Sequence, residues 1–189
     1  MPTTIQSIIH LYAAKGGARY GSELVSQLEH ALQCAQLAQE EGARAELVAA
    51  AFLHDVGHLV VERPHFMGRE IDNLHQFVGL PLLRPLFGAA VLEPIRLHVE
   101  AKRYLCQAEA GYWERLAPSS KYSLELQGGP FSAGEAGGFL GRLHARESIR
   151  LRRWDDRARL PGQSLPDLDF AAAVLENAAG CHKTAMAGA

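Results

Sequence analysis

The residues with the clearest chemical potential are His54-Asp55-Val56-Gly57-His58, which end a nearly continuous apolar run that begins at Ala45. Imidazole and carboxylate groups together suit Zn, Mn or Fe. A buried, ionised aspartate is costly unless it is paired, hydrogen-bonded or bound to a cation. The dipeptide therefore indicates a metal site, although a hydrogen-bonded core histidine beside a capping aspartate would give the same pattern.

The metal interpretation is strengthened by four further residues on separate predicted helices: His30, His75, His98 and Asp155. Each alone would more often be an ordinary helix residue. Helices of a bundle can project such side chains inward from different segments, and dinuclear metal sites in bundle cores are built this way. The predicted metal ligands are His30, His54, Asp55, His75, His98 and Asp155.

The elements that must position these residues are helical. Apolar residues at three-to-four spacing predict an all-α fold, and no strand alternation or internal repeat is visible. The stretch 117–141 is rich in Ser, Gly and Pro and predicts a long loop. Helices are expected over 4–14, 22–41 and 45–56, near His75, from Glu93-Pro94 through Tyr104 with the proline in the tolerated first position, and over 143–158 and 168–179.

Composition bounds the class of protein. A chain of 189 residues with 48% hydrophobic residues fits one domain, 1–189. A net charge of -2 gives no electrostatic support for nucleic acid or an anionic membrane as a partner. The three cysteines form no CxxC pair, which argues against a disulfide framework or a structural zinc site. We expect a soluble, cytoplasmic protein that is a monomer or a weak homo-oligomer.

The pattern H…HD…H…H…D resembles the HD-domain superfamily, whose fold is a compact helical bundle around a mono- or dinuclear metal site. His75 and His98 correspond to the dinuclear version, which occurs in some phosphodiesterases and in oxygenases. Four further segments are similar to the mixed-valent di-iron oxygenases, above all the 2-amino-1-hydroxyethylphosphonate dioxygenase group, with myo-inositol oxygenase more distant. These segments are Tyr20-Gly-Ser-Glu23, His98 to Lys102, Leu124 to Gly129 and Arg152 to Asp156, so that the likeness spans about 20–159.

The chemistry that the resemblance implies agrees with the residue types. Four imidazoles and two carboxylates give six ligands for two metals, so each ion keeps open positions, and Asp55 is the natural bridge. The resemblance implies two iron ions (Fe²⁺/Fe³⁺), O2 as co-substrate and a small 1-hydroxy-2-(alkyl)aminoethylphosphonate substrate. Oxidative cleavage of the C–P bond would give phosphate and an amino acid. The implied catalytic residues are Asp55, His58 and Lys102.

A phosphonate also needs cations and hydrogen-bond donors around its oxygens. Lys102 lies one turn after His98, Arg152 lies three residues before Asp155, and His58 lies one turn beyond His54. Alternatively, Lys102 and Arg152 could simply lie on solvent-exposed helix faces, as most charged residues do. In the resembled oxygenases, residues matching Tyr20 and Glu23 occupy the metal site until substrate arrives. The predicted substrate-binding residues are Tyr20, Glu23, His58, Lys102, Ser120, Ser123, Gln127 and Arg152.

Two other functions fit the same residues. A metal-activated water would make the chain a phosphohydrolase acting on a nucleotide or another phosphate ester. A non-catalytic regulator that binds a metal or an anion would also use Lys102 and Arg152. Oxygen consumption with phosphate release from a hydroxyphosphonate separates the oxygenase from the hydrolase, and ligand binding without turnover would indicate the regulator.

Overall fold

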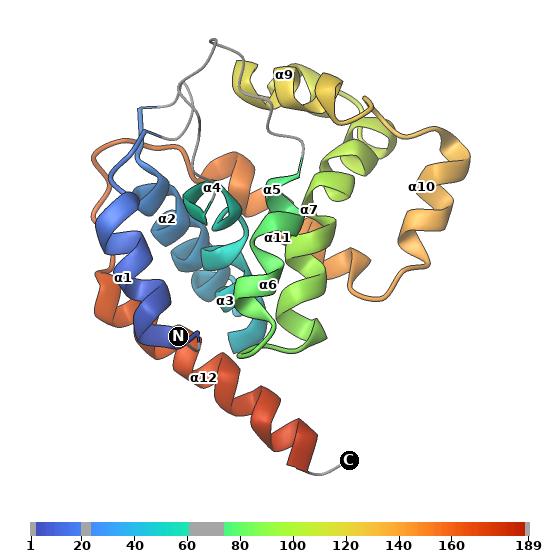
Figure 1. The fold of residues 1–189 in the computed structure, drawn as a ribbon. Coiled ribbons are helices and arrows are strands. Elements are labelled where there is room, and N and C mark those ends of the chain that lie inside the picture. The colour runs from blue at the N-terminus through green and yellow to red at the C-terminus, as the bar shows by residue number, and fades with distance from the viewer. Residues whose placement is uncertain (1–2, 20–23, 61–73, 188–189) are drawn as a thin grey trace.

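The computed structural model describes residues 3–19, 24–60 and 74–187, and within these residues the chain is all helical, with no strand. The helices are α1 (Ile5–Lys15), α2 (Gln27–Glu40), α3 (Ala45–Leu53), α4 (Gly57–Val60), α5 (His75–Val78), α6 (Leu80–Leu83), α7 (Ala89–Ala108), α8 (Tyr112–Arg115), α9 (Pro118–Leu126), α10 (Ala133–Leu140), α11 (Ala145–Arg157) and α12 (Leu168–Ala187). In Figure 1, α9 lies at the top and α10 at the right edge of the molecule, and the C-terminal part of α12 extends away from the other helices.

Helix α3 is the centre of the core. All of its residues from Leu47 to Leu53 are buried, and α3 packs against α2, α7, α11 and α12. Alanines at 49, 50 and 51 let neighbouring helices approach closely on several sides, while Phe52 and Leu53 supply apolar volume. Helix α3 is followed by a turn that begins at His54. His54 and Asp55 therefore lie directly at the end of this buried helix.

The helix starts are set by capping. Thr4 and Ser7 form a capping box at α1, and Ser26 and Glu29 form one at α2. The helix predicted from residue 22 therefore begins at Gln27, and Leu24, which precedes it, is 71% exposed. The predicted helix over 45–56 likewise ends at Leu53, because 54–56 form the turn into α4.

The predicted start of the helix that carries His98 was wrong. Helix α7 begins at Ala89 after the extended N-cap Gly88, so that Pro94 lies inside the helix. A proline in a helix lacks the N–H that would bond to the carbonyl four residues earlier. The loss is tolerated here near the start of a 20-residue helix in which Pro94 is buried among apolar neighbours.

The long loop predicted over 117–141 was also wrong, since this stretch forms α9 and α10. Pro118 occupies the first turn of α9, where its missing N–H costs nothing. Ser132 and Glu135 form a capping box at α10. Glycines inside α10 and after α9 hid the pattern, and α9 packs on α7 while α10 packs on α7 and α11.

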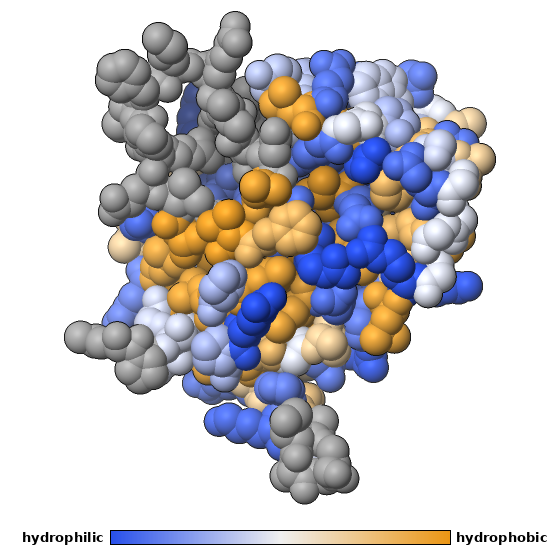
Figure 2. Space-filling model, turned by 45° about the vertical axis from the view of Figure 1, so that its right-hand side comes forward, coloured by the Kyte–Doolittle hydropathy of each residue, from blue (hydrophilic) through white to orange (hydrophobic). Residues whose placement is uncertain are grey.

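The remaining long helices lie close to their predicted positions. The helix expected over 143–158 is α11, and α12 extends to Ala187 instead of ending at 179. Among the described residues, no helix has the length and apolar character that a membrane crossing requires. Figure 2 shows apolar side chains gathered in the middle of one face among polar ones, an ordinary feature of globular surfaces.

Candidate metal centre

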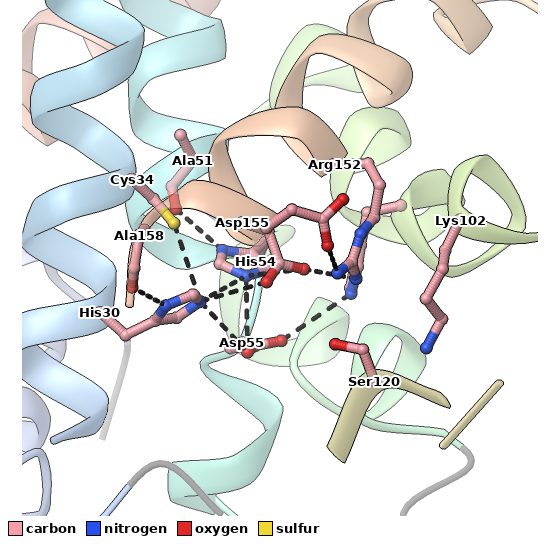
Figure 3. A network of polar contacts seen from close by, with 12 residues as sticks. His30, Cys34, Ala51, His54, Asp55, Lys102, Ser120, Arg152, Asp155 and Ala158 are labelled. Atoms are coloured by element: carbon pink, nitrogen blue, oxygen red, sulfur yellow. Dashed lines mark hydrogen bonds and ion pairs between the residues drawn. The ribbon is translucent and has the colours of Figure 1, made fainter. Parts of the chain in front are cut away.

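Two histidines and two aspartates converge in a buried pocket, which we call the first pocket. His30 comes from α2, His54 and Asp55 from the end of α3, and Asp155 from α11 (Figure 3). The Nε2 atoms of His30 and His54 are 3.3 Å apart. The Oδ2 atom of Asp55 lies 3.4 Å from His54 Nε2, and the Oδ1 atom of Asp155 lies 3.5 Å from His30 Nε2. Four potential donor atoms thus surround one point.

Backbone carbonyls fix the orientation of both imidazoles in the first pocket. The Nδ1–H of His30 donates to the carbonyl oxygen of Ala158 at 2.7 Å, and that of His54 donates to Ala51 at 2.9 Å. A neutral imidazole that donates from Nδ1 carries an unprotonated Nε2, whose lone pair can bind a metal. The two lone pairs therefore face each other in a buried space, an arrangement that a cation between them would stabilise.

A second group of imidazoles, which we call the second pocket, faces the other oxygen of Asp55. The Oδ1 atom lies 3.2 Å from His75 Nε2 and 3.8 Å from His98 Nε2, and these two nitrogens are 2.9 Å apart. The Nδ1–H of His98 donates to the carbonyl oxygen of Ile95 at 2.7 Å. His58 Nε2 lies 3.9 Å from Asp55 Oδ1, and the ring of His58 stacks on that of His75 at 4.5 Å between centroids.

Asp55 is shared by the two pockets, with one oxygen directed to each. Its Oδ2 atom is buried and makes no hydrogen bond in the described structure. Burial alone would raise the pKa of Asp55, but the imidazoles of His54 and His75 hold it well below its usual range. An ionised, buried oxygen without a hydrogen-bond donor is what a cation would satisfy, so the residues fit metal binding, with Asp55 in contact with both histidine groups.

Burial also lowers the pKa of two of the histidines, His30 and His98. It lowers the pKa of His30 to about 4, against an opposing contribution from Asp155. Burial, reinforced by the neighbouring imidazole of His75, lowers the pKa of His98 well below its usual value. Both imidazoles are therefore neutral near pH 7, the form that binds a metal.

Two arginines hold Asp155 in place. Arg152 Nη1 lies 2.6 Å from Asp155 Oδ2, and Arg159 Nη2 donates to Oδ1 at 3.1 Å. Burial alone would raise the pKa of Asp155, but these cations and His54 keep it well below its usual range. Arg152 also bonds to Asp156, which accepts a hydrogen bond from the Tyr112 hydroxyl. The carboxylate that faces the first pocket is thus ionised and oriented.

Gly57 allows the second pocket to form. A Cβ atom at this position would lie 2.1 Å from the carbonyl oxygen of His75, which is closer than any real contact. Gly79 sits against the same turn, because a Cβ there would lie 2.7 Å from a side-chain carbon of Val56. Helices α4 and α5 can therefore approach backbone to backbone, and this approach brings His75 to Asp55.

Polar residues from α7, α9 and α11 lie beside the two pockets. The Lys102 side chain is buried, and its Nζ donates to Ser123 Oγ at 2.7 Å. Ser123 Oγ donates to the carbonyl oxygen of Ser120 at 3.1 Å, and Arg159 donates to Ser120 Oγ at 3.1 Å. Burial, together with the positive charge of Arg152, lowers the pKa of Lys102 to about 7. The alternative of a solvated face for Lys102 and Arg152 is wrong, since both are buried.

The structure describes only some of the remaining predicted site residues. Gln127 ends α9, and its side-chain oxygen is buried without a hydrogen-bond partner in the described structure. Tyr20 and Glu23 lie outside the described residues, so their predicted positions at the site stay predictions. The sequence analysis missed Arg159, which follows Asp155 by one helical turn, and Cys34, whose Sγ lies 3.7 Å from His30 Nε2. The i,i+4 spacing from a predicted ligand was the signal for both.

Comparisons with known proteins agree with this architecture. The HD domain family matches residues 28–130, more than half of the chain. A hydroxymethylphosphonate dioxygenase from Gimesia maris is 44% identical over 168 residues, which cover 87% of this chain and 82% of that protein. A [1-hydroxy-2-(trimethylamino)ethyl]phosphonate dioxygenase (glycine-betaine-forming) from Leisingera caerulea is 34% identical over 164 residues, 86% and 84% of the two chains. The His54-Asp55 dipeptide lies between the two pockets, and this chain belongs to the HD-domain family.

Proposed function

We propose that this chain is a di-iron, O2-dependent oxygenase that cleaves the C–P bond of a small 1-hydroxyphosphonate, acting as a single domain over 1–189. The observation that carries the proposal is the pairing of two histidine pockets on Asp55 with the buried cations Lys102 and Arg152 beside them. The two relatives support it, because both are named as dioxygenases of phosphonates with a hydroxyl on the carbon next to phosphorus.

The proposed metal ligands are His30, His54 and Asp155 in the first pocket, His75 and His98 in the second, and Asp55 as the bridge. Iron is favoured because O2 chemistry needs a redox-active metal, which zinc is not. Bound iron would supply acidity toward the substrate hydroxyl and electron transfer to O2. The ligand carboxylates are ionised and His30 and His98 are neutral, so these residues are in the state that metal binding requires.

The remaining residues act on the substrate. Lys102 and Arg152 would neutralise the phosphonate, and Ser120 and Ser123 would donate hydrogen bonds to its oxygens. Lys102 gives up its bond to Ser123 or shares it when the anion enters. His58, stacked on His75 at the edge of the second pocket, is placed to accept the proton of the substrate hydroxyl. Buried cations fix the phosphonate, so the reacting carbon is held beside Asp55.

The overall reaction balances without another reactant. One C–H and the C–P bond of the hydroxyl-bearing carbon are broken, and both atoms of O2 are retained in the products. One oxygen enters the carboxylate, and the other enters phosphate. Hydroxymethylphosphonate would give formate, and a 1-hydroxy-2-aminoethylphosphonate would give glycine or its N-methylated equivalent.

The decisive experiment loads the full chain with iron without air and then adds 1-hydroxyphosphonates with no substituent, a primary amine or a trimethylammonium group. The expected result is O2 consumption with equimolar phosphate release for at least one of them. A phosphonate that lacks the hydroxyl is the matched control and should give neither signal. Phosphate release from phosphate esters without O2, and none from the hydroxyphosphonates, would replace the oxygenase with a hydrolase.

A further inference from the structure

Cys34 lies one turn after His30 on α2 and faces the same pocket. Its side chain is buried, and its Sγ lies 3.7 Å from His30 Nε2. The donor atoms of His30, Cys34 and His54 all lie within 4.8 Å of one another (Figure 3). The two histidines of the first pocket are therefore common to two donor sets, one completed by carboxylates and one completed by sulfur.

The spacing of the sulfur set matches a tetrahedral cation. Zinc bonds of about 2.05 Å to nitrogen and 2.3 Å to sulfur place two nitrogens about 3.3 Å apart, and a nitrogen and a sulfur about 3.6 Å apart. The observed separations are 3.3 Å between His30 Nε2 and His54 Nε2, and 3.7 Å between His30 Nε2 and Cys34 Sγ. The donor atoms of Cys34 and His54 are also within 4.8 Å of each other, so one cation can contact both imidazoles and the sulfur.

A fourth donor is present and free of hydrogen bonds. Asp55 Oδ2 is buried, makes no hydrogen bond in the described structure, and lies 3.4 Å from His54 Nε2 and 3.8 Å from His30 Nε2. These separations are near those expected for nitrogen and oxygen on one tetrahedral ion, about 3.3 to 3.5 Å. The cysteine is therefore one of four converging donors, and the aspartate oxygen makes no hydrogen bond in the described structure.

We propose that His30, Cys34, His54 and Asp55 form a binding site for a thiophilic d¹⁰ cation, Zn²⁺ or Cd²⁺, that competes with iron for the first pocket. Binding converts the Cys34 thiol to a thiolate, and the proton passes to solvent. Thiolate ligands select softer metals, whereas the alternative set of two imidazoles and two carboxylates suits iron. A zinc ion held here would fill the pocket with a metal that has no redox chemistry.

This inference concerns which cation the first pocket accepts and how, so it can be tested without turnover. The probe is Co²⁺, which takes tetrahedral zinc sites and shows a sulfur-to-cobalt charge-transfer absorption in the near ultraviolet when a thiolate binds. The full-length chain is stripped of metal with a chelator and titrated with Co²⁺. The expected result is a charge-transfer band that grows until one equivalent of thiolate-bound cobalt has formed.

The variants identify the sulfur. Cys34→Ser should bind Co²⁺ with no charge-transfer band, and Cys34→Ala should do the same, which guards against failure of one variant to fold. Cys181→Ser, which changes an exposed thiol, is the matched control and should keep the band. In competition with a zinc chelator, the Kd for Zn²⁺ should rise at least ~10-fold in Cys34→Ser, since even outer partners of metal ligands change affinity by that factor.

Two results would overturn the inference. Cobalt bound by the wild-type chain without a sulfur band, or a band that persists in both Cys34 variants, would remove Cys34 from the site. Neither result touches the oxygenase proposal, because iron-dependent turnover would stand. Absence of turnover together with a Cys34-dependent cobalt band would instead refute the oxygenase proposal and support the thiophilic site.

Discussion

The two pockets share one aspartate but are built from different kinds of element. His30 and Asp155 of the first pocket come from α2 and α11, helices of 14 and 13 residues. In the second pocket, His75 comes from a four-residue helix, α5, and only His98 comes from a long one. Long helices packed on α3 hold their side chains more rigidly than single turns do. We therefore expect the first pocket to bind its cation more tightly than the second.

The largest effect should come from the residue that joins the pockets. Asp55→Asn replaces one of two oxygens with an NH₂ group that cannot bind a metal. Iron content should fall in both pockets, and O2 consumption should drop by more than ~10²-fold, beyond the loss seen when a partner of a ligand is removed. Elemental analysis gives the iron per chain. Exposed Asp169→Asn is the matched control, and two irons retained in Asp55→Asn would refute the shared bridge.

His98→Ala tests the difference between the pockets directly. It should leave the first pocket intact, so that iron content falls from two ions to one while the helical circular dichroism spectrum is unchanged. Turnover should be lost with the second ion. His10→Ala, an exposed histidine on α1, should keep both ions. If His98→Ala emptied both pockets, the two would be one cooperative unit and the comparison would fail.

Lys102→Met tests whether phosphonate binding can be weakened while the metal ions stay bound. A hydrogen bond to a charged group contributes about 1.5–3 kcal/mol, so KM for the phosphonate should rise about 10- to 100-fold. Iron content should stay at the wild-type value, because the hydrogen bond that the Lys102 amine donates among the described residues goes to Ser123, which is not a proposed metal ligand. Kinetics over a range of phosphonate concentrations, with iron measured on the same samples, decide the outcome. A lowered iron content would mean that Lys102 supports the metals.

The same lysine predicts a pH dependence. Burial and Arg152 lower the pKa of Lys102 to about 7, so the substrate-free amine loses its charge as the pH rises through 7. KM for the phosphonate should therefore increase above pH 7, by up to about 10-fold per pH unit. Lys102→Arg, which stays charged, should show a flatter profile. An unchanged slope in this variant would assign the pH dependence to another group.

The smallest effect is expected at Arg159. Arg159→Gln removes one of the two guanidinium groups on Asp155 and leaves Arg152 in place. The iron affinity of the first pocket should fall by about 10-fold, while KM for the phosphonate changes little. Competition with a chelator measures the affinity. An equal loss of iron affinity in the second pocket would show that the Arg159–Asp155 contact affects both pockets.

The sequence was sufficient for the all-helical class, because helical spacing is a local property. The convergence of four histidines and two aspartates was predicted from the whole set and its likeness to the HD-domain pattern, since each residue alone is a weak signal. The sequence was not sufficient for 117–141, where glycines within α10 and after α9 hid the helical pattern that packing on α7 and α11 stabilises. Pro94 misled for a related reason, since its burial inside α7 outweighs one missing backbone hydrogen bond. The i,i+4 spacing marks Cys34 and Arg159 as neighbours of predicted ligands, but their contacts required the structure, because these depend on which face of each helix meets Asp55 and Asp155.

The contact between Gly57 and the backbone of His75 bears on how such a centre is gained or lost. An alanine codon differs from a glycine codon by a single base. The added methyl would push α5 away and withdraw His75, while the first pocket, which depends on other helices, would persist. We therefore expect one nucleotide at this position to decide whether descendants of this gene can hold two cations or only one.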